Sequence, residues 1–332
     1  MAKNLLTDAS TVLVTGSSGF LGSWLVADLH AAGHRVIGVD MVANALSENL
    51  LDSFHLHDLR TPFSDRLPTI DVCIHLANAA GGFLRNVRLE SLVDSELTML
   101  QHVRDMCDEA KCRKIVYTSS VNVFEASGVR EEAPLKGLTQ KTPYARGKAK
   151  GEAYVEKNFE RFTILRPTNY FGADQPRHST TVGESHVIPD LLHKIRTQDV
   201  VEILGNGEQV RNFLHVSDLS RLILQTLGQD GRSHMNVRSD LFLSIRTLAL
   251  QLMETISVQK PLRFDASYSR YETSPVTAFP CEATTRLGWT PTVSSIYEGL
   301  CFKRINAKPA PINNKDNHTS ALARQWREAL LG

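Results

Sequence analysis

The chain lacks several features that would place it in a membrane or on a polyanion. Nowhere among its 332 residues do about 18 apolar residues run together, as a membrane-spanning helix requires, and residues 1–8 lack the apolar core of a signal peptide. Its 37 basic and 36 acidic residues give a formal net charge of +1, which creates no long-range field for nucleic acid. We therefore expect a soluble, cytoplasmic protein that binds neither nucleic acid nor a membrane.

Paired cysteines and metal-ligand clusters are also missing from the sequence. The five cysteines are odd in number and scattered, at positions 73, 107, 112, 281 and 301. No Cys-x-x-Cys spacing and no neighbouring pair of histidines marks a zinc site. We expect reduced thiols packed within the fold and no bound metal. The hydrophobic content of 42% is ordinary for a globular chain, and the length allows two packed domains.

What the chain does contain is a strand, a glycine-rich turn and a helix start near its beginning. The apolar, β-branched run 11–15 ends at Gly16, and glycines recur at Gly19 and Gly22. This spacing frees a turn of Cβ clashes, lets backbone N–H groups approach a pyrophosphate and allows a helix to pack closely on a strand. The anion would lie at the positive end of the helix dipole. The glycines alone also fit an ordinary strand-to-helix turn.

Two acidic residues follow at positions that bear on the cofactor. The second apolar run, 35–39, ends in Asp40, close to the ~20-residue offset at which a carboxylate accepts hydrogen bonds from the adenosine ribose. A carboxylate there disfavours a 2′-phosphate, so we predict NAD rather than NADP. The run 54–60 is a candidate third strand, and Asp58 within it either meets the adenine amino group or caps a turn.

Strand and helix signals alternate along the first half of the chain. The runs 71–77 and 113–120 have the apolar character of buried strands, and 89–110 carries apolar residues at helical spacing. Such alternation predicts right-handed crossovers and an α/β fold, a Rossmann-like, doubly wound parallel sheet. Ligands bind at the carboxyl ends of its strands, where Ala77 and the small residues after it leave room for a cofactor.

A hydroxyl and a tyrosine–lysine pair occur at positions suited to acid–base chemistry. The run 113–120 ends in Ser120, and Tyr144 and Lys148 stand four residues apart at a predicted helix start, which places them on one helix face. An ammonium beside a phenol favours the phenolate, so a group with a reference pKa near ~10 can act as a base nearer neutrality. The spacing alone also fits a surface helix; together with the glycine loop, Asp40 and Ser120 it favours catalysis.

In this order, the segments resemble the extended short-chain dehydrogenase/reductases, and within them the NAD-dependent nucleotide-sugar epimerase/dehydratase family. The motifs that carry the likeness are Thr15-Gly16-x-x-Gly19-Phe20-Leu21-Gly22, His75-Leu76-Ala77, Val116-Tyr117-Thr118-Ser119-Ser120, Tyr144-x-x-x-Lys148, Leu165-Arg166-Pro167-Thr168-Asn169-Tyr170-Phe171-Gly172, Val187-Ile188-Pro189, 205–219 and 286–291. The resemblance implies a Rossmann domain that binds NAD, a smaller C-terminal domain that binds a nucleotide-diphosphate sugar, and a homodimer.

The resemblance also implies roles for individual residues. Arg211 contacts the diphosphate of the substrate, Asn169 lies near the phosphates or the sugar, Val187 and Ile188 flank the base, and Arg270 is a second candidate for the diphosphate, although Tyr271-Glu272 departs from the family pattern. The residues expected to contact NAD are Gly16, Ser18, Gly19, Phe20, Leu21, Gly22, Asp40, Asp58, Leu59, Leu76, Ala77, Tyr144 and Lys148. Ser120, Tyr144 and Lys148 are the expected catalytic residues, and Ser120 also contacts the sugar.

The predicted domain boundaries follow the same likeness. Residues 1–168, joined again by 212–240, form the NAD-binding domain; 169–211 and 241–305 form the substrate domain; and 306–332 form a C-terminal appendage.

The residues after Ser120 discriminate between the reactions of the family. Dehydratases of the family resemble one another in having acidic residues directly after this serine. Here the two positions are Val121 and Asn122, and neither side chain can shuttle a proton. Val121 also replaces the cysteine that is typical of the GDP-sugar 3,5-epimerases and fucose synthases. The Gly81-Gly82 pair, in contrast, resembles the corresponding segment of those enzymes. We therefore expect an epimerase acting at C4 of a UDP- or dTDP-sugar through a transient 4-keto intermediate. The alternatives are a 4-ketoreductase, a dehydratase, a decarboxylase or a non-catalytic NAD-binding regulatory protein.

Overall fold

The computed structural model describes residues 9–44, 48–79, 82–124, 140–176, 179, 181, 183–271, 281 and 287–301. The chain divides into two compact units, Met1–Phe302 and Lys303–Gly332. All described residues belong to the first unit, so the predicted appendage 306–332 lies outside them. Within the described ranges, no helix combines the length and the apolar character that crossing a membrane requires.

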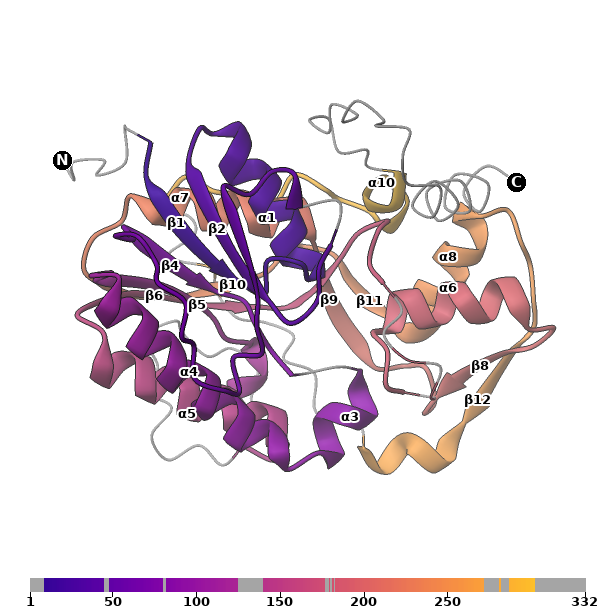
Figure 1. The fold of residues 1–332 in the computed structure, drawn as a ribbon. Coiled ribbons are helices and arrows are strands. Elements are labelled where there is room, and N and C mark those ends of the chain that lie inside the picture. Colours follow the sequence, from indigo (N-terminus) through magenta and orange to yellow (C-terminus); the bar gives the residue numbers. More distant parts are fainter. Residues whose placement is uncertain are drawn as a thin grey trace, which may run out of the picture. The chain divides into compact units, whose positions relative to one another are not determined.

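A seven-stranded sheet forms the centre of the first unit (Figure 1). Its strands are β1 (Thr11–Thr15), β2 (Arg35–Asp40), β3 (Ser53–Leu56), β4 (Val72–His75), β5 (Lys114–Thr118), β6 (Arg161–Pro167) and β10 (Arg232–Val237). They lie in the order β10-β6-β5-β4-β1-β2-β3, and every neighbouring pair is parallel. The order reverses between β1 and β4, and at such a switch point ligands bind beyond the carboxyl ends of the strands. The predicted Rossmann-like, doubly wound fold is confirmed.

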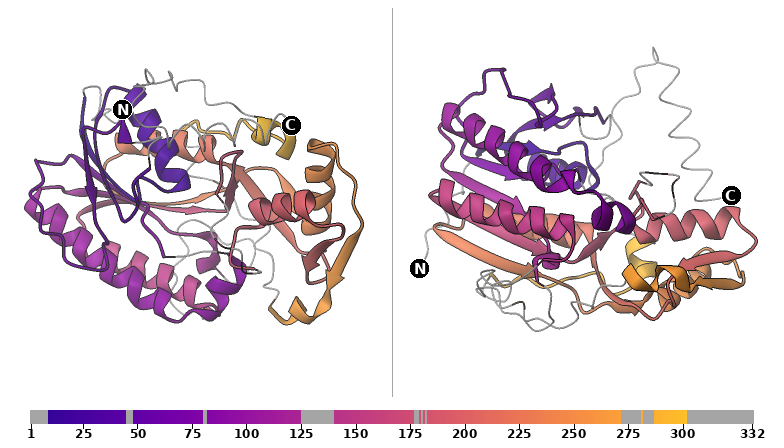
Figure 2. Two further views of the ribbon diagram at one scale, coloured as in Figure 1. Left: turned by 45° about the vertical axis from the view of Figure 1, so that its right-hand side comes forward. Right: turned by 90° about the horizontal axis from the view of Figure 1, so that it is seen from below.

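Helices cover both faces of this sheet. They are α1 (Phe20–Ala31) and α7 (Val216–Leu227) on one face, and α4 (Ser91–Glu109) and α5 (Pro143–Asn158) on the other. On β1, Val12 and Val14 pack with the first pair, whereas Leu13 packs with the second. Alternate strand residues thus enter different cores, and a strand buried on both sides has to be apolar throughout. Figure 2 shows α4 and α5 side by side.

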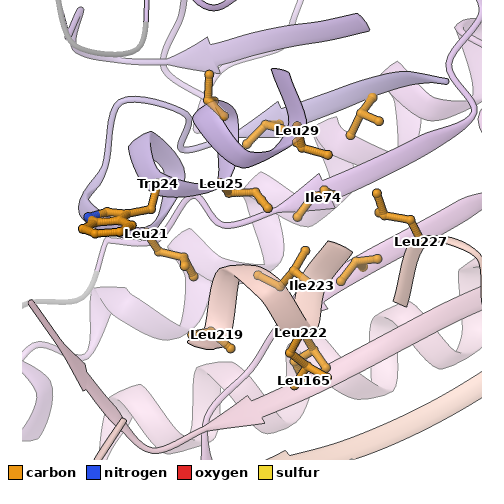
Figure 3. Close-up of a cluster of buried hydrophobic side chains, with 14 of the residues drawn as sticks. Leu21, Trp24, Leu25, Leu29, Ile74, Leu165, Leu219, Leu222, Ile223 and Leu227 are labelled. Atoms are coloured by element: carbon orange, nitrogen blue, oxygen red, sulfur yellow. The ribbon is translucent and has the colours of Figure 1, made fainter. Parts of the chain in front are cut away.

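The core between α1, α7 and the sheet is built from aliphatic side chains that meet from distant parts of the chain. Leu25 of α1, Ile74 of β4 and Leu222 of α7 are all fully buried there (Figure 3). Burial of one such side chain stabilises the fold by roughly 1.5–3 kcal/mol. This packing holds the start of α1 against the carboxyl ends of β1 and β4.

A second group of elements begins at the carboxyl edge of the sheet, because its first strand follows β6 after a single residue. The group comprises β7 (Asn169–Phe171), α6 (Val187–Thr197), β8 (Val201–Leu204), β9 (Val210–His215), β11 (Phe242–Ser244), α8 (Ile245–Thr255), β12 (Leu262–Asp265), η2 (Ala266–Tyr271) and α10 (Ile296–Cys301). Strands β11, β9 and β7 form one sheet, and β12 pairs with β8. An apolar core of its own, with Phe171, Ile195 and Leu248, lies among them.

The chain returns to the main sheet through α7 and β10, whereas β9 stays with the second group. The division into an NAD-binding and a substrate domain stays a prediction. Two local differences from the sequence analysis concern element ends. Strand β3 stops at Leu56, so Asp58 lies in the turn beyond it, and the helix expected over 89–110 is α4, preceded by a separate short helix α3 (Phe83–Arg88).

Candidate active site

The glycine loop lies against the exit of β4, and its glycines are required by that contact. Gly16 has a φ of +74°, and a Cβ on it would come within 2.7 Å of the backbone nitrogen of Ala77. A Cβ on Gly22 would come within 1.9 Å of the Gly16 carbonyl oxygen. Gly19 precedes the first turn of α1 with an extended backbone. The loop therefore passes between β4 and α1 at a distance that only glycine allows.

The start of α1 can accept an anion. Phe20 and Leu21 are its first two residues, and the first N–H groups of a helix have no partner within the helix. Leu21 turns its side chain into the core, so its backbone alone faces the loop. Among the described residues, the buried hydroxyls of Ser17 and Ser18 have no hydrogen-bond partner. Hydroxyl and N–H donors gathered here fit the pyrophosphate of a dinucleotide.

Asp40 lies at the carboxyl end of β2, beside the same loop. Its Oδ2 atom accepts a hydrogen bond from the Ser18 backbone N–H at 2.9 Å, and Oδ1 accepts one from Val42 N–H at 3.1 Å. Burial raises the pKa of Asp40 above its ordinary value, while these N–H groups act in the other direction. A half-buried carboxylate with free acceptor capacity suits the two hydroxyls of an adenosine ribose.

The remaining residues predicted to contact the cofactor divide into two sets. Leu76 and Ala77 follow β4 at the switch point, and Leu76 N–H donates to the Thr15 carbonyl at 3.1 Å. Asp58 instead forms an ion pair with Arg60 at 2.6 Å, and Leu59 is buried in the core beneath α4. The contact of Asp58 and Leu59 with NAD stays a prediction.

Ser120 and Tyr144 meet at the carboxyl edge of the sheet. Ser120 follows β5, and its Oγ atom accepts a hydrogen bond from Asn122 N–H at 3.2 Å. Tyr144 stands in the first turn of α5, whose start is set by Pro143 and by the Thr142 hydroxyl, which accepts from Ala145 N–H at 3.1 Å. Burial raises the pKa of the Tyr144 phenol, and the Ser120 hydroxyl lies close enough to lower it in part.

Lys148 lies one turn further along α5 and is buried. Its Nζ atom donates to the Thr118 carbonyl at 2.9 Å and to Oε1 of Glu96 at 2.9 Å. The Tyr117 hydroxyl donates to the same carboxylate oxygen at 2.6 Å. Glu96 is not among the residues predicted from the sequence, although its position four residues after Leu92 puts a carboxylate within the apolar stripe of α4.

A second buried ion pair fixes α5 to β6. Glu152 of α5 and Arg166 of β6 are joined at 2.6 Å, and the Ser119 hydroxyl donates to the same carboxylate. The guanidinium lies 4.7 Å from the ring centre of Phe124. Because Ser119 precedes Ser120, this network holds the strand end that carries the predicted catalytic hydroxyl.

The residues predicted to hold the substrate belong to the second group of elements. Asn169 begins β7 and is exposed, and its Nδ2 atom donates to the Asn212 carbonyl at 3.2 Å. Arg211 lies on the neighbouring strand β9 and is half-buried. Val187 and Ile188 begin α6, where Ile188 is buried in the apolar core and Val187 is half-buried. The side chain of Arg270 lies outside the described residues.

Tyr170 is a further aromatic residue at this edge that the sequence analysis did not assign. It stacks on Phe20, the first residue of α1, with ring centres 6.1 Å apart and planes inclined by 15°. It is also close enough to Tyr144 to raise the pKa of that phenol. The second group of elements thus contributes a phenol beside both the glycine loop and the expected catalytic residues.

A hydroxyl on β5 adds to the fit with a dinucleotide. The buried Oγ1 atom of Thr118 has no hydrogen-bond partner among the described residues, and the neighbouring carbonyl holds Lys148. Within the described residues, no group of three His, Cys, Asp or Glu side chains is placed to hold a metal ion.

Comparisons with known proteins agree with this geometry. A family model described as the NAD dependent epimerase/dehydratase family matches residues 12–237. A dTDP-4-dehydro-6-deoxy-D-allose reductase of a Streptomyces species is 29% identical over 278 residues, covering 77% of this chain and 84% of that protein. A UDP-glucose 4-epimerase of Mycolicibacterium smegmatis is 27% identical over 317 residues, covering 87% and 95%. The crystal structure of a dTDP-glucose 4,6-dehydratase from Streptomyces venezuelae, which contains NAD, has the same fold, with a TM-score of 0.73, 23% identity and coverage of 87% and 94%.

Proposed function

The chain belongs to the NAD-dependent epimerase/dehydratase family, and from this premise we propose that it is an enzyme acting at C4 of a nucleotide-diphosphate sugar. The reaction that we propose is epimerisation of a UDP- or dTDP-sugar through a transient 4-keto sugar. NAD, when bound, exchanges a hydride with the sugar carbon. The protein's own side chains then have three tasks: to move a proton at the C4 oxygen, to hold that oxygen in place and to hold the diphosphate.

The observation that carries the proposal is the position of Ser120, just after β5, close to Tyr144 at the start of α5, with Lys148 one turn further along the same helix. In the proposed reaction Tyr144 takes the proton of the C4 hydroxyl and later returns one to the ketone oxygen. Ser120 donates a hydrogen bond to the same oxygen, and Lys148 holds the nicotinamide ribose. Acid–base catalysis of this kind contributes about 10²–10⁴ in rate.

The substrate end of the site rests on Arg211 and Asn169. They lie on the neighbouring strands β9 and β7 of the second group, and both have side chains at least partly accessible. A guanidinium is a planar, permanently charged donor that matches phosphate oxygens. We assign the diphosphate to Arg211, and the phosphates or the sugar to Asn169. Val187, which is half-buried at the start of α6, is the better placed of its pair to contact the base, because Ile188 is buried.

Reduction of a 4-keto nucleotide sugar is the second candidate function. It is favoured by the similarity of this chain to two dTDP-4-dehydro-6-deoxy-D-allose reductases, both from Streptomyces. The catalytic residues required are the same, but the proton moves only from Tyr144 to the ketone oxygen. Elimination of water is disfavoured, because Val121 and Asn122 beside the site offer no acid or base.

The two reactions are distinguished by incubating the protein with UDP- and dTDP-sugars and with their 4-keto forms. Epimerisation leaves the substrate mass unchanged and accumulates no NADH, whereas reduction adds two hydrogens and consumes NADH. Tyr144→Phe is expected to retain the fold and NAD binding while losing at least about 10²-fold in turnover. Full activity of Tyr144→Phe would refute the assignment. Binding of NAD without turnover of any of these sugars would instead support a non-catalytic NAD-binding protein.

A further inference from the structure

A buried carboxylate lies beside the lysine on which the proposed chemistry depends. Glu96 of α4 is 3% exposed, yet it stands within an otherwise apolar helix face. Its Oε1 atom accepts two hydrogen bonds, from Lys148 Nζ at 2.9 Å and from the Tyr117 hydroxyl at 2.6 Å. The ammonium also lies 4.9 Å from the ring centre of Tyr117. Glu96, Lys148 and Tyr117 therefore form one closed cluster beneath the carboxyl edge of the sheet.

The charges of this cluster cancel. Burial of an isolated ammonium or carboxylate is strongly unfavourable, and a pair is tolerated when each charge is matched by the other and by hydrogen bonds. An unpaired lysine would favour the phenolate form of a neighbouring tyrosine. Paired with Glu96, Lys148 loses much of that influence, and the carboxylate itself raises the pKa of Tyr144.

The other titratable groups around the cluster do not reverse this balance. His75 on β4 stacks on the ring of Tyr117, and burial lowers its pKa to about 4, so it is neutral near pH 7. Tyr170 on β7 raises the pKa of the catalytic phenol further. The remaining buried ions close by, Glu152 and Arg166, are paired with each other.

On the basis of the proposed function, we propose that Glu96 is a positioning residue that cancels the charge of Lys148, so that Tyr144 rests as a neutral phenol ready to protonate the ketone of a nucleotide sugar. In that reduction the carbonyl carbon gains a hydride from the reduced dinucleotide, which is oxidised. The carbonyl oxygen gains the phenolic proton, and water then reprotonates the phenolate. A resting phenol thus suits the step that epimerisation and net ketone reduction share, the reduction of the 4-keto sugar near neutral pH. The opposite step of epimerisation, oxidation of the sugar alcohol, needs the phenolate and therefore becomes faster as the pH rises.

The first test is a titration of Tyr144 in the full-length protein without substrate. The absorbance of tyrosinate is followed against pH, and the Tyr144→Phe curve is subtracted to isolate this phenol. Glu96→Gln leaves the ammonium of Lys148 uncompensated, so the Tyr144 midpoint should fall by about one pH unit or more. The pH at which the rate of ketone reduction falls to half should move down equally. An unchanged midpoint in Glu96→Gln would overturn the proposal.

Two matched variants separate charge from hydrogen bonding. Tyr117→Phe removes the second hydrogen bond to Glu96 but keeps both charges, so the Tyr144 midpoint should stay where it is. Asp105→Asn removes an exposed carboxylate from the same helix, and it should also leave the midpoint in place. A downward movement in Tyr117→Phe as large as that in Glu96→Gln would mean that packing, and not charge, sets the state of the phenol, and this too would overturn the proposal.

Because Glu96→Gln leaves a buried charge unpaired, it can unfold the protein. The double variant Glu96→Leu/Lys148→Met removes both charges and leaves apolar side chains in their place. If the pair is neutral as a whole, the Tyr144 midpoint in the double variant should match that of the parent. A midpoint raised by about one pH unit would show that Lys148 acts uncompensated, against the proposal. These titrations need no substrate, so a failure to turn over nucleotide sugars would count against the proposed function alone.

Discussion

Acidification below pH 7 should destabilise the protein through one buried histidine. His75, on β4, is 1% exposed, and its Nδ1 atom shares a hydrogen bond with the Thr15 hydroxyl at 2.7 Å. Burial lowers the pKa of His75 from its ordinary value of 6.5 to about 4, with opposing contributions from Glu96 and Lys148. The folded protein therefore binds this proton much more weakly than the unfolded chain does.

The sign and size of the effect follow from proton linkage. Well above pH 6.5 the imidazole of His75 is neutral in both the folded and the unfolded state, so the histidine does not lower the free energy of unfolding. Between pH 6.5 and about 4 the unfolded chain is protonated and the folded protein is not, so the free energy of unfolding falls as the pH falls. Each tenfold difference in proton affinity corresponds to about 1.4 kcal/mol, so this histidine should remove roughly 3 kcal/mol between pH 7 and pH 4.

The assay is urea unfolding at a series of pH values, compared with His75→Asn, whose side chain does not titrate. The difference between the two pH dependences isolates the contribution of the buried imidazole. His30→Asn, which removes an exposed imidazole, serves as the control and should leave the pH dependence as it is. Identical pH dependences for the protein and His75→Asn would refute the reasoning.

Three further outcomes are expected. Gly16→Ala should abolish NAD binding in a fluorescence titration, since the new Cβ would lie 2.7 Å from the Ala77 nitrogen in a backbone with φ of +74°; wild-type affinity would contradict the loop geometry. Asp218→Asn should lower the free energy of unfolding, measured in urea, by about 3 kcal/mol. The fully buried carboxylate accepts hydrogen bonds from Thr292 N–H at 3.0 Å and from Thr292 Oγ1 at 2.7 Å. A loss under ~1 kcal/mol would show that these hydrogen bonds do not stabilise the fold. The predicted homodimer should appear by light scattering at twice the mass of the chain; a monomer would fit the polar exposed positions of α4, such as Asp94 and Asp105.

The sequence by itself determined the middle of the central sheet, because β1, β2, β4 and β5 are short, mainly apolar runs whose side chains are almost all buried. Local chemistry also determined where helices begin: Thr142 and Pro143 place the start of α5, and with it the four-residue spacing of Tyr144 and Lys148. The glycine loop could also be predicted from the sequence, because Gly16 lies so close to the end of β4 that a residue with a Cβ atom would clash there. Each of these features depends on neighbours in the chain or on a conformation that one residue type alone adopts.

Only the tertiary structure decided which polar groups share the space beneath the carboxyl edge of the sheet. Glu96 is 52 residues from Lys148, and helical periodicity showed no more than a carboxylate on an apolar face. In the same way, Ile188 proved to be buried and Tyr170 to stack on Phe20. The physical reason is that charge compensation and ring stacking act over a few ångströms in space, whatever the separation along the chain, so a pattern read along the sequence contains no record of them.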